Sequence, residues 1–196
     1  MRNWSANQVE LILIRHGKTM ANEEHRYIGR SDEALSDKGR SDIRDKKSFY
    51  DRMGLLECDL FVCSPMLRCR ETAEILFKGK KVQVIPEWTE IDFGLFEGKN
   101  HRELSGNMAY QEWIDSNGTL PFPEGESREE FIDRSIAGLK SLKSMAGEAK
   151  KIAAVVHGGT IMALASYFDK GDYFDYQIKN GQMYRLVLEE EQWWNI

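Results

Sequence analysis

An apolar run at residues 9–14 ends directly in the tripeptide Arg15-His16-Gly17. The run is apolar almost throughout, which is typical of a parallel strand that is covered on both faces. The glycine loosens the turn, so an imidazole and a guanidinium lie side by side where a buried strand ends. This arrangement suits a histidine that attacks phosphorus while arginine holds the phosphoryl oxygens. A tripeptide alone is weak evidence, so other segments must supply the remaining parts of such a site.

Strand-like runs alternate with helix-like segments along the rest of the chain. Further strands are expected at 59–63, 82–85, 152–156 and 183–188. Helices are expected after Ser36, after Ser64-Pro65, from Ser127 and around 161–168. This alternation predicts an α/β domain with a mainly parallel central sheet.

Three of the helix starts have recognisable capping signals. Ser36 precedes Asp37, and the helix that follows places three residues on one side: Ile43, Tyr50 and Met53. Ser64-Pro65 predicts a serine cap with proline at the first helical position. The apolar stripe of that second helix would be Met66, Cys69, Ala73 and Leu76. Ser127 with Glu130 has the form of a capping box, and it opens a helix with five core positions: Phe131, Ile132, Ile136, Leu139 and Leu142.

Length and composition indicate one soluble globular domain over residues 1–196. The chain is 41% hydrophobic and 30% charged, which is ordinary for such a domain. A net charge of −5 argues against a general nucleic-acid or anionic-membrane binder. The first apolar run is too short for a signal peptide or a membrane span. We therefore expect no nucleic-acid and no membrane partner.

The three cysteines are Cys58, Cys63 and Cys69. They have no paired C-x-x-C spacing, so the sequence suggests neither a zinc site nor a disulfide framework. Small buried thiols in a reducing cytoplasm are the expected interpretation. No carboxylate or histidine cluster has metal-ligand spacing, and we expect neither a metal nor an organic cofactor.

Polar residues follow three of the expected strands. Arg15 and His16 come after the first strand, Arg68 lies just past the second, and His157 follows the strand at 152–156. Ligands of open α/β sheets bind outside the carboxyl ends of the strands. We therefore expect these side chains to meet at one edge of the sheet.

Four segments together resemble the histidine phosphatase superfamily, the phosphoglycerate-mutase-like enzymes. The segments are LIRHGKTMAN at 13–22, SPMLRCRETA at 64–73, EIDFGLFEG at 90–98 and VHGG at 156–159. They occur in the order of the family, and the resemblance runs from about residue 10 to 188. YIGRSD at 27–32 and GES at 125–127 also resemble the α-ribazole phosphatase branch and its broad-specificity phosphatase relatives.

The resemblance implies a three-layer α/β/α sandwich with about six strands, in which residues 88–125 cover the site. His16 is expected to be the nucleophile that forms a phosphohistidine. Arg15 and Arg68 are expected to clamp the phosphate, because phosphoryl transfer depends mainly on positioning and charge stabilisation. His157 would donate a hydrogen bond to the phosphoryl group. Asn22 and the backbone near Ile28 and Gly29 match positions that line the phosphate or substrate pocket of relatives; a turn-forming role is the alternative for Asn22. Gly158 allows close approach of the backbone to the phosphate and exposes free N–H groups at the start of the next helix.

The family pattern assigns the general acid to Glu90. The leaving oxygen needs a proton and the attacking water later needs a base, and one carboxyl with a raised pKa can serve both steps. Composition alone cannot choose Glu90 over its neighbours Glu87, Asp92 and Glu97. Nearby aromatic side chains could wall the substrate or close the core, and the core is favoured for them: Trp88, Phe93, Phe96 and Trp113.

The sequence predicts a metal-independent phosphomonoesterase that hydrolyses a small phosphorylated metabolite, with α-ribazole 5′-phosphate as the leading candidate. The enzymatic alternative is a cofactor-dependent phosphoglycerate mutase. Against a mutase, the region after Glu90 is short and His157 is followed by Gly-Gly. The alternative from another class is a non-catalytic phosphate-binding module, which would lack the nucleophile, a clamp or the acid. The sequence leaves a homodimer open.

Overall fold

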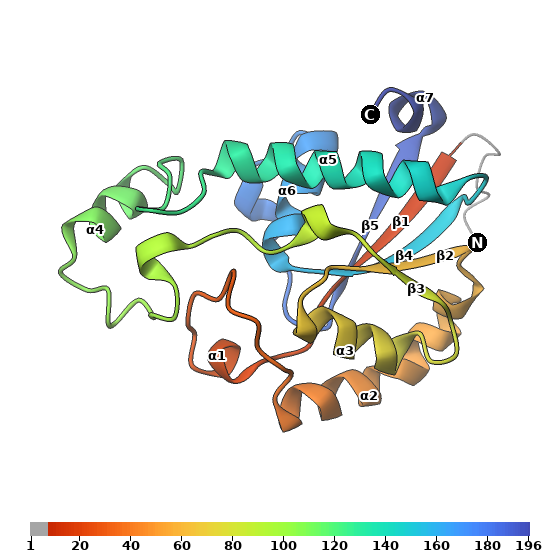
Figure 1. Cartoon of the computed structure of the whole chain (residues 1–196), viewed down its shortest axis with the longest axis horizontal. Coiled ribbons are helices and arrows are strands. Elements are labelled where there is room, and N and C mark those ends of the chain that lie inside the picture. The colour runs from red at the N-terminus through yellow and green to blue at the C-terminus, as the bar shows by residue number, and fades with distance from the viewer. Residues whose placement is uncertain (1–7) are drawn as a thin grey trace.

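The sheet contains five strands in the order β3-β2-β4-β1-β5 (Figure 1). The structure is a computed structural model that describes residues 8–196. The first seven residues of the predicted domain lie outside the described residues. The strands are β1 (Gln8–Arg15), β2 (Leu60–Cys63), β3 (Val82–Val84), β4 (Lys151–Val156) and β5 (Met183–Glu189).

Four strands run parallel and one runs antiparallel, which confirms the predicted α/β class. β1 pairs in parallel with β4, and β2 pairs in parallel with both β4 and β3. β5 is antiparallel to β1 at the edge. The expected count of about six strands is wrong by one. The long segment between β3 and α5 contributes only an isolated bridge, Arg26 with Asn100, rather than another strand.

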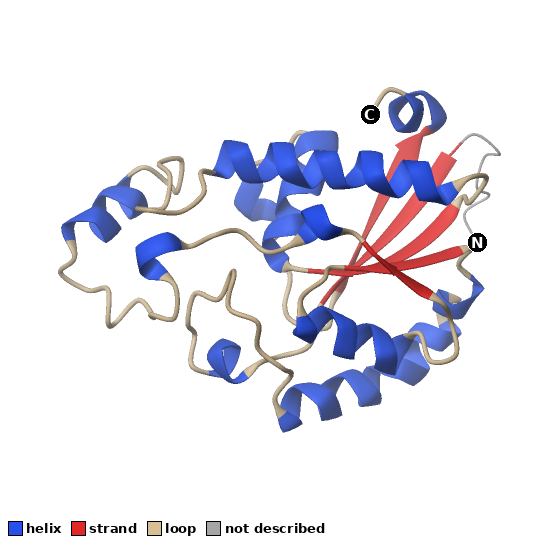
Figure 2. Ribbon diagram, in the orientation of Figure 1, coloured by secondary structure: helices blue, strands red, loops and turns tan. Residues whose placement is uncertain are grey.

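Helices cover both faces of the sheet, so the fold has three layers (Figures 1 and 2). α2 (Asp37–Arg52) and α3 (Leu67–Leu76) lie on one face, and α5 (Arg128–Ala146) and α6 (Gly158–Asp169) lie on the other. Three shorter α-helices are α1 (Met20–Glu23), α4 (Met108–Asp115) and α7 (Glu190–Trp194). Four 3-10 turns are η1 (Leu55–Glu57), η2 (Pro86–Trp88), η3 (Gly94–Phe96) and η4 (Tyr173–Tyr176).

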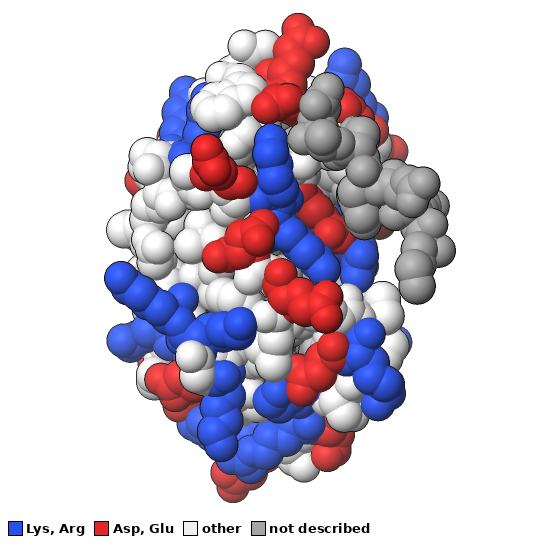
Figure 3. Space-filling model, turned by 90° about the vertical axis from the view of Figure 1, so that its right-hand side faces the viewer, with Lys and Arg blue, Asp and Glu red and all other residues white. Residues whose placement is uncertain are grey.

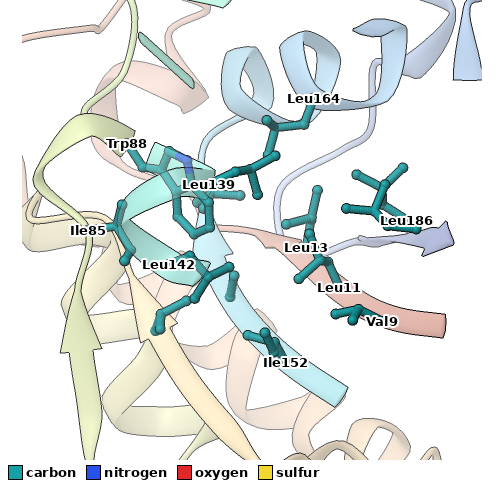
Figure 4. Packing of buried hydrophobic residues seen from close by; sticks show 14 of the residues in the cluster. Val9, Leu11, Leu13, Ile85, Trp88, Leu139, Leu142, Ile152, Leu164 and Leu186 are labelled. Carbon is teal, nitrogen blue, oxygen red and sulfur yellow. The ribbon is translucent and has the colours of Figure 1, made fainter. Parts of the chain in front are cut away.

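The central strand β1 buries both of its faces. Leu11 and Leu13 pack in the cluster that includes Leu139 of α5 and Leu164 of α6 (Figure 4). Ile12 and Ile14 point to the opposite face and belong to the cluster formed with α2 and α3. Successive side chains of a strand point to opposite faces, so a strand covered on both sides is apolar over most of its length. Glu10 is the buried exception inside β1, and its carboxylate pairs with Arg185 of β5 at 2.9 Å.

Two of the predicted helix starts are confirmed. The Ser36 hydroxyl accepts a hydrogen bond from the Gly39 N–H at 2.9 Å, and Ser127 with Glu130 forms the expected capping box at the start of α5. Ile43 and Tyr50 are buried as expected. Met53 is not, because α2 ends at Arg52 and the Met53 side chain is 42% exposed.

The predicted helix start at Ser64-Pro65 is wrong. α3 begins at Leu67 with Met66 as its N-cap, so Pro65 is outside the helix. The Ser64 hydroxyl instead lies 2.7 Å from Nε2 of His157 and accepts from the Met66 N–H at 3.3 Å. Ser64 is fully buried at the end of β2. The neighbouring strand β4 ends just before His157, so the His157 ring lies beside the Ser64 hydroxyl and becomes its partner. Arg68 is consequently the second residue of α3.

Charged side chains of both signs lie on the surface of the protein. On the face that Figure 3 shows, Lys and Arg side chains are interspersed with Asp and Glu side chains. Within residues 8–196, no helix is both long enough and apolar enough to cross a membrane.

A glycine on α5 lets a tryptophan pack directly against the helix. Trp88 is fully buried, and its Nε1–H donates to the Ser135 carbonyl at 3.1 Å. A Cβ at Gly138 would lie 2.3 Å from Trp88 Nε1 and 2.5 Å from Cδ1. Because Trp88 is held on all sides, it cannot move away from such a methyl group. Trp88 precedes Glu90 by two residues, so this packing also fixes the segment that carries Glu90.

We expect Gly138→Ala to destabilise the fold. At an open helical position, this change would stabilise the helix by about 1 kcal/mol. Here overpacking against Trp88 reverses the sign, with a net loss of about 1–2 kcal/mol. The urea midpoint should therefore fall, whereas Ser144→Ala at an exposed position of α5 should leave it unchanged. A midpoint for Gly138→Ala at or above that of the wild type would contradict this packing.

Candidate active site

His16 follows β1, and its ring is held in one tautomer. Its Nδ1 lies 2.7 Å from the carbonyl oxygen of Gly17. A carbonyl can only accept, so Nδ1 carries the proton and Nε2 keeps its lone pair. The sequence could not identify this partner, which belongs to the backbone of the next residue.

The surroundings of His16 keep its ring neutral. The side chain is 3% exposed, and burial lowers its pKa well below the ordinary value. The positive charges of Arg68 and Arg15 lower the pKa further, against a smaller opposite effect of the Gly17 carbonyl. A neutral imidazole with a free Nε2 lone pair is the nucleophilic form.

Both predicted clamp arginines are anchored by backbone carbonyls. Arg15 donates to the Ile178 carbonyl at 2.6 Å, and Arg68 donates to the carbonyls of Gly29 at 2.9 Å and Ser31 at 2.8 Å. In each arginine the Nε–H is buried and has no hydrogen-bond partner within residues 8–196. A buried donor without an acceptor costs about 1–3 kcal/mol, which an anion beside it would relieve. Two such donors therefore favour a negatively charged ligand here.

His157 lies behind His16 at the start of α6. The two ring centroids are 5.2 Å apart, and the rings meet edge to face. The Nε2 of His157 contacts the Ser64 hydroxyl, and the Cys69 sulfur lies 3.5 Å from the same nitrogen. Burial lowers the pKa of His157 well below its usual value, and the charge of Arg68 adds to this effect.

The Glu90 carboxyl lines the same cavity as His16. It accepts from the Ile91 N–H at 3.0 Å and from the Gly159 N–H at 3.4 Å. Burial raises its pKa, and these N–H groups and the two arginines oppose that rise only in part. A Cβ at Gly159 would lie 2.3 Å from Glu90 Oε1, so glycine is needed for this close approach. A buried carboxyl with a raised pKa is suited to donating a proton.

The structure separates Glu90 from the three carboxylates that composition could not exclude. Glu97 accepts from the N–H groups of Gly29 and Ser31, and Glu87 accepts from the Ser141 hydroxyl. Asp92 accepts from the Gly94 N–H. Of the four, Glu90 is the one that lines the cavity.

A partly buried ion pair fixes the backbone that carries Glu90. Arg134 of α5 pairs with Glu126 at 2.7 Å. The same guanidinium donates to the carbonyls of Glu87 at 2.6 Å, Thr89 at 2.7 Å and Glu90 at 3.3 Å. The segment Gly125-Glu126-Ser127 therefore supports the wall of the site through Glu126.

A cavity of about 1020 Å³ opens in front of His16. Six predicted site residues line it: Arg15, His16, Asn22, Ile28, Glu90 and Gly158. Gly29, Arg68 and His157 do not line it but are buried next to residues that do. Gly29 follows Ile28, Arg68 (1% exposed) donates to the Gly29 carbonyl, and the His157 ring (0% exposed) packs against His16. All nine predicted residues are thus brought to the carboxyl edge of the sheet, three of them beneath the surface.

The outer part of the cavity is aromatic. Its rings belong to Tyr27, Phe93, Trp113, Phe122, Tyr173 and Phe174. The guanidinium of Arg128 lies 4.8 Å from the Tyr173 ring centroid and 5.0 Å from that of Phe174. Of the aromatic residues assigned to the core from sequence, Trp88 and Phe96 are buried there, whereas Phe93 and Trp113 form part of the wall.

Sequence reasoning missed several residues that support the site. Ser64 was assigned to a helix cap, and Cys69 to an apolar stripe. Asn180, which donates to the His16 carbonyl at 3.1 Å, was not considered at all. The one signal for Asn180 in the sequence is its position just before the last strand. Asn180 reaches the site because that strand, β5, runs antiparallel to β1 and therefore starts beside the carboxyl end of β1. Within residues 8–196, no group of three or more His, Cys, Asp or Glu side chains is arranged to hold a metal ion.

Comparison with known proteins decides the family. The sequence model of the histidine phosphatase superfamily (branch 1) matches residues 11–195. The chain belongs to this superfamily. An adenosylcobalamin/alpha-ribazole phosphatase from Escherichia coli K12 is 30% identical over 164 residues, which cover 80% of this chain and 77% of that protein. The chain is accordingly an enzyme, a phosphatase of the histidine phosphatase superfamily.

Two further matches extend the comparison. A probable phosphoglycerate mutase from Escherichia coli O1:K1 is 26% identical over 196 residues, covering 94% of this chain and 87% of that protein. The crystal structure of the alpha-ribazole phosphatase from Shigella flexneri is 26% identical and has a TM-score of 0.77, covering 90% of this chain and 89% of that chain. The names of these two proteins differ in the reaction: one is a mutase and the other a phosphatase.

The buried neutral histidines predict a stability that falls in acid. Folded His16 and His157 have pKa values well below 6.5, whereas the unfolded chain takes up a proton near that value. Below about pH 6.5 the unfolded state binds more protons, so the free energy of unfolding decreases by up to about 1.4 kcal/mol per pH unit for each histidine. We expect His16→Asn to reduce this slope between pH 6.5 and 5.5, as measured by urea unfolding.

The raised pKa of Glu90 has the opposite effect on this slope. Above pH 4.5, the ordinary pKa of a glutamate, the folded state keeps the Glu90 proton longer than the unfolded state does, so the contribution of Glu90 to the free energy of unfolding falls as the pH rises. Comparing slopes between wild type and variant cancels this contribution. Ser144→Ala, which removes no titratable group from an exposed position of α5, is the control and should retain the slope of the wild type. An unchanged slope in His16→Asn would mean that His16 is protonated in the folded state.

Proposed function

We propose that this phosphatase is a metal-independent phosphomonoesterase that acts through a phosphohistidine at His16. The observation that carries the proposal is the fixed tautomer of His16, whose ring is under the positive charges of Arg15 and Arg68 and lines the same cavity as the buried carboxyl of Glu90. The nucleophile, the charge clamp and the acid are each supplied by side chains of the chain itself. The proposal needs no cofactor, no nucleic acid and no membrane.

In the first step, Nε2 of His16 attacks the phosphorus of the ester and the bond from phosphorus to the ester oxygen breaks. Protonated Glu90 gives its proton to the departing oxygen, which leaves as an alcohol. Arg15 and Arg68 stabilise the charge on the equatorial phosphoryl oxygens, and His157 donates a further hydrogen bond.

In the second step, a water molecule attacks the phosphohistidine. The Glu90 carboxylate takes a proton from this water, the P–N bond breaks, and inorganic phosphate is released. His16 returns to its neutral form and Glu90 to its protonated form, so the cycle consumes one water and one ester. The binding roles of Asn22, Ile28, Gly29 and Gly158 belong to this proposal, because they line or support the phosphate end of the cavity.

The proposed substrate is a small phosphorylated metabolite with a bulky leaving group, and α-ribazole 5′-phosphate is the leading candidate. Two matched proteins are named for α-ribazole phosphatase activity. A cavity of about 1020 Å³ is at the upper end of ligand pockets and offers aromatic walls to the part beyond the phosphate. A cytoplasmic location is also proposed; three buried cysteines with free thiols support it.

A phosphoglycerate mutase is the second candidate function, because one matched protein carries that name. The two functions differ in what happens to the phosphohistidine: a mutase returns the phosphoryl group to the substrate, and a phosphatase gives it to water. Incubation with 3-phosphoglycerate separates them, since a mutase yields the 2-isomer and a phosphatase yields inorganic phosphate. A panel of phosphorylated metabolites, including α-ribazole 5′-phosphate, then ranks substrates by kcat/KM.

We expect the wild type to hydrolyse p-nitrophenyl phosphate at the same rate with and without a metal chelator. His16→Ala should lower turnover to background, because no other group can form the covalent intermediate. Release of nitrophenolate measures both effects. Loss of activity on chelation would contradict the metal-independent mechanism, and substantial turnover by His16→Ala would contradict the covalent one.

Glu90→Gln should affect esters according to their leaving group. Nitrophenolate needs little protonation, so its hydrolysis should fall by less than about tenfold. Alkyl phosphates need the proton, and their hydrolysis should fall by about 10²–10⁴, the usual contribution of general acid catalysis. The ratio of kcat/KM for the two substrate types measures the difference. Equal losses for both would remove Glu90 from the role of acid.

A further inference from the structure

The chain segment before β5 reaches the phosphoryl site although none of it was predicted there. Because β5 is antiparallel to β1, the chain enters β5 beside the carboxyl end of β1. The Gly181 N–H donates to the Arg15 carbonyl at 2.9 Å, and the Ile178 carbonyl accepts from the Arg15 guanidinium at 2.6 Å. This edge segment, residues 177–182, therefore contacts the nucleophile's own loop.

One side chain of the edge segment contacts two parts of the site. The Nδ2 of Asn180 lies 3.1 Å from the His16 carbonyl oxygen and 3.1 Å from Oδ1 of Asn22. Both Asn180 and Asn22 line the cavity. The contact pair connects the loop after β1 with α1 and the edge segment.

The chemistry of the partners fixes both amide orientations. The Thr19 backbone N–H can only donate, and it lies 3.2 Å from the Asn22 side chain, so that end of Asn22 must be the oxygen. The His16 carbonyl can only accept, so the end of Asn180 facing it must be the NH₂ group. Asn22 Oδ1 thus accepts two hydrogen bonds, from Thr19 and from Asn180.

With its oxygen turned to Thr19 and Asn180, Asn22 keeps its NH₂ group for a ligand. No hydrogen bond joins this NH₂ group to another group among residues 8–196. Rotation of the amide by 180° would set its NH₂ group against the N–H donors of Thr19 and Asn180, which would break both contacts. Asn22 and Arg15 line the same cavity, and a primary amide donor beside a guanidinium suits a phosphoryl oxygen.

We propose that Asn180 is a positioning residue, which orients the Asn22 amide so that its NH₂ group donates to the phosphoryl group. This inference rests on the proposed function, because it assumes that the phosphoryl group binds beside His16. Asn180 acts through Asn22, and the His16 carbonyl holds the Asn180 amide in place. Loss of the Asn180 amide should leave Asn22 free to rotate, which weakens phosphate binding without removing the nucleophile.

The experiment is a double-mutant cycle of Asn22→Ala and Asn180→Ala. The measurements are kcat/KM for p-nitrophenyl phosphate and the inhibition constant of inorganic phosphate. Each single variant should lose about tenfold in both quantities, as expected for one hydrogen bond to a charged group. If Asn180 acts through Asn22, the double variant should lose far less than the product of the single losses, by at least about threefold.

The matched control is Lys46→Ala. The Lys46 ammonium donates to the carbonyls of Asn180 at 3.2 Å and Gly181 at 3.1 Å, so it holds the edge segment without touching Asn22. This variant should leave phosphate inhibition within about twofold of the wild type. If Asn180→Ala does not fold, Asn180→Asp is the near-isosteric replacement. Its carboxylate oxygens would face the His16 carbonyl and Asn22 Oδ1, which are both acceptors, so kcat/KM and phosphate inhibition should fall at least as much as expected for Asn180→Ala.

The possible failures are distinguishable. A folded wild type that hydrolyses no phosphate ester overturns the proposed function. An active wild type in which the losses of Asn22→Ala and Asn180→Ala multiply, or in which Lys46→Ala weakens phosphate as much as Asn180→Ala does, overturns the role of Asn180 alone. An Asn180→Asp variant with the inhibition constant of the wild type overturns it as well.

Discussion

The hydrogen bond from Nδ1 of His16 to the Gly17 carbonyl is the interaction on which the site depends. It assigns the proton to one nitrogen and leaves the other as a nucleophile. Burial and the two flanking arginines keep that second nitrogen unprotonated. The same arginines retain buried N–H donors for an anion, so one arrangement of charge both activates the histidine and attracts the group it attacks.

The fold makes this arrangement possible by burying everything else along β1. Both faces of the strand are covered, which leaves its carboxyl end as the place where polar groups can meet a ligand. The residues that follow three parallel strands, β1, β2 and β4, lie at this edge. The residues before the antiparallel β5 also lie at this edge. Arg134 of α5 pairs with Glu126 and holds the backbone of the segment that carries Glu90.

Much of this could be predicted from the sequence, because strand ends and capping residues leave local signals. The run before His16 and the capping box at Ser127 are examples. The position of Asn180 could not be predicted, since it depends on the direction of β5, which is set by pairing between strands far apart in the chain. Ser64 shows the same limit: its local sequence favours a helix cap, but the neighbouring strand brings His157 within hydrogen-bond distance.

The most direct test of the central claim is to locate the covalent phosphoryl group during turnover. A reacting sample labelled with phosphorus-32 is quenched, digested under alkaline conditions and mapped by peptide. The account predicts an acid-labile label on the peptide that contains His16, formed and lost at rates that match turnover. A label on another residue, or hydrolysis that proceeds with no covalent label, would contradict it.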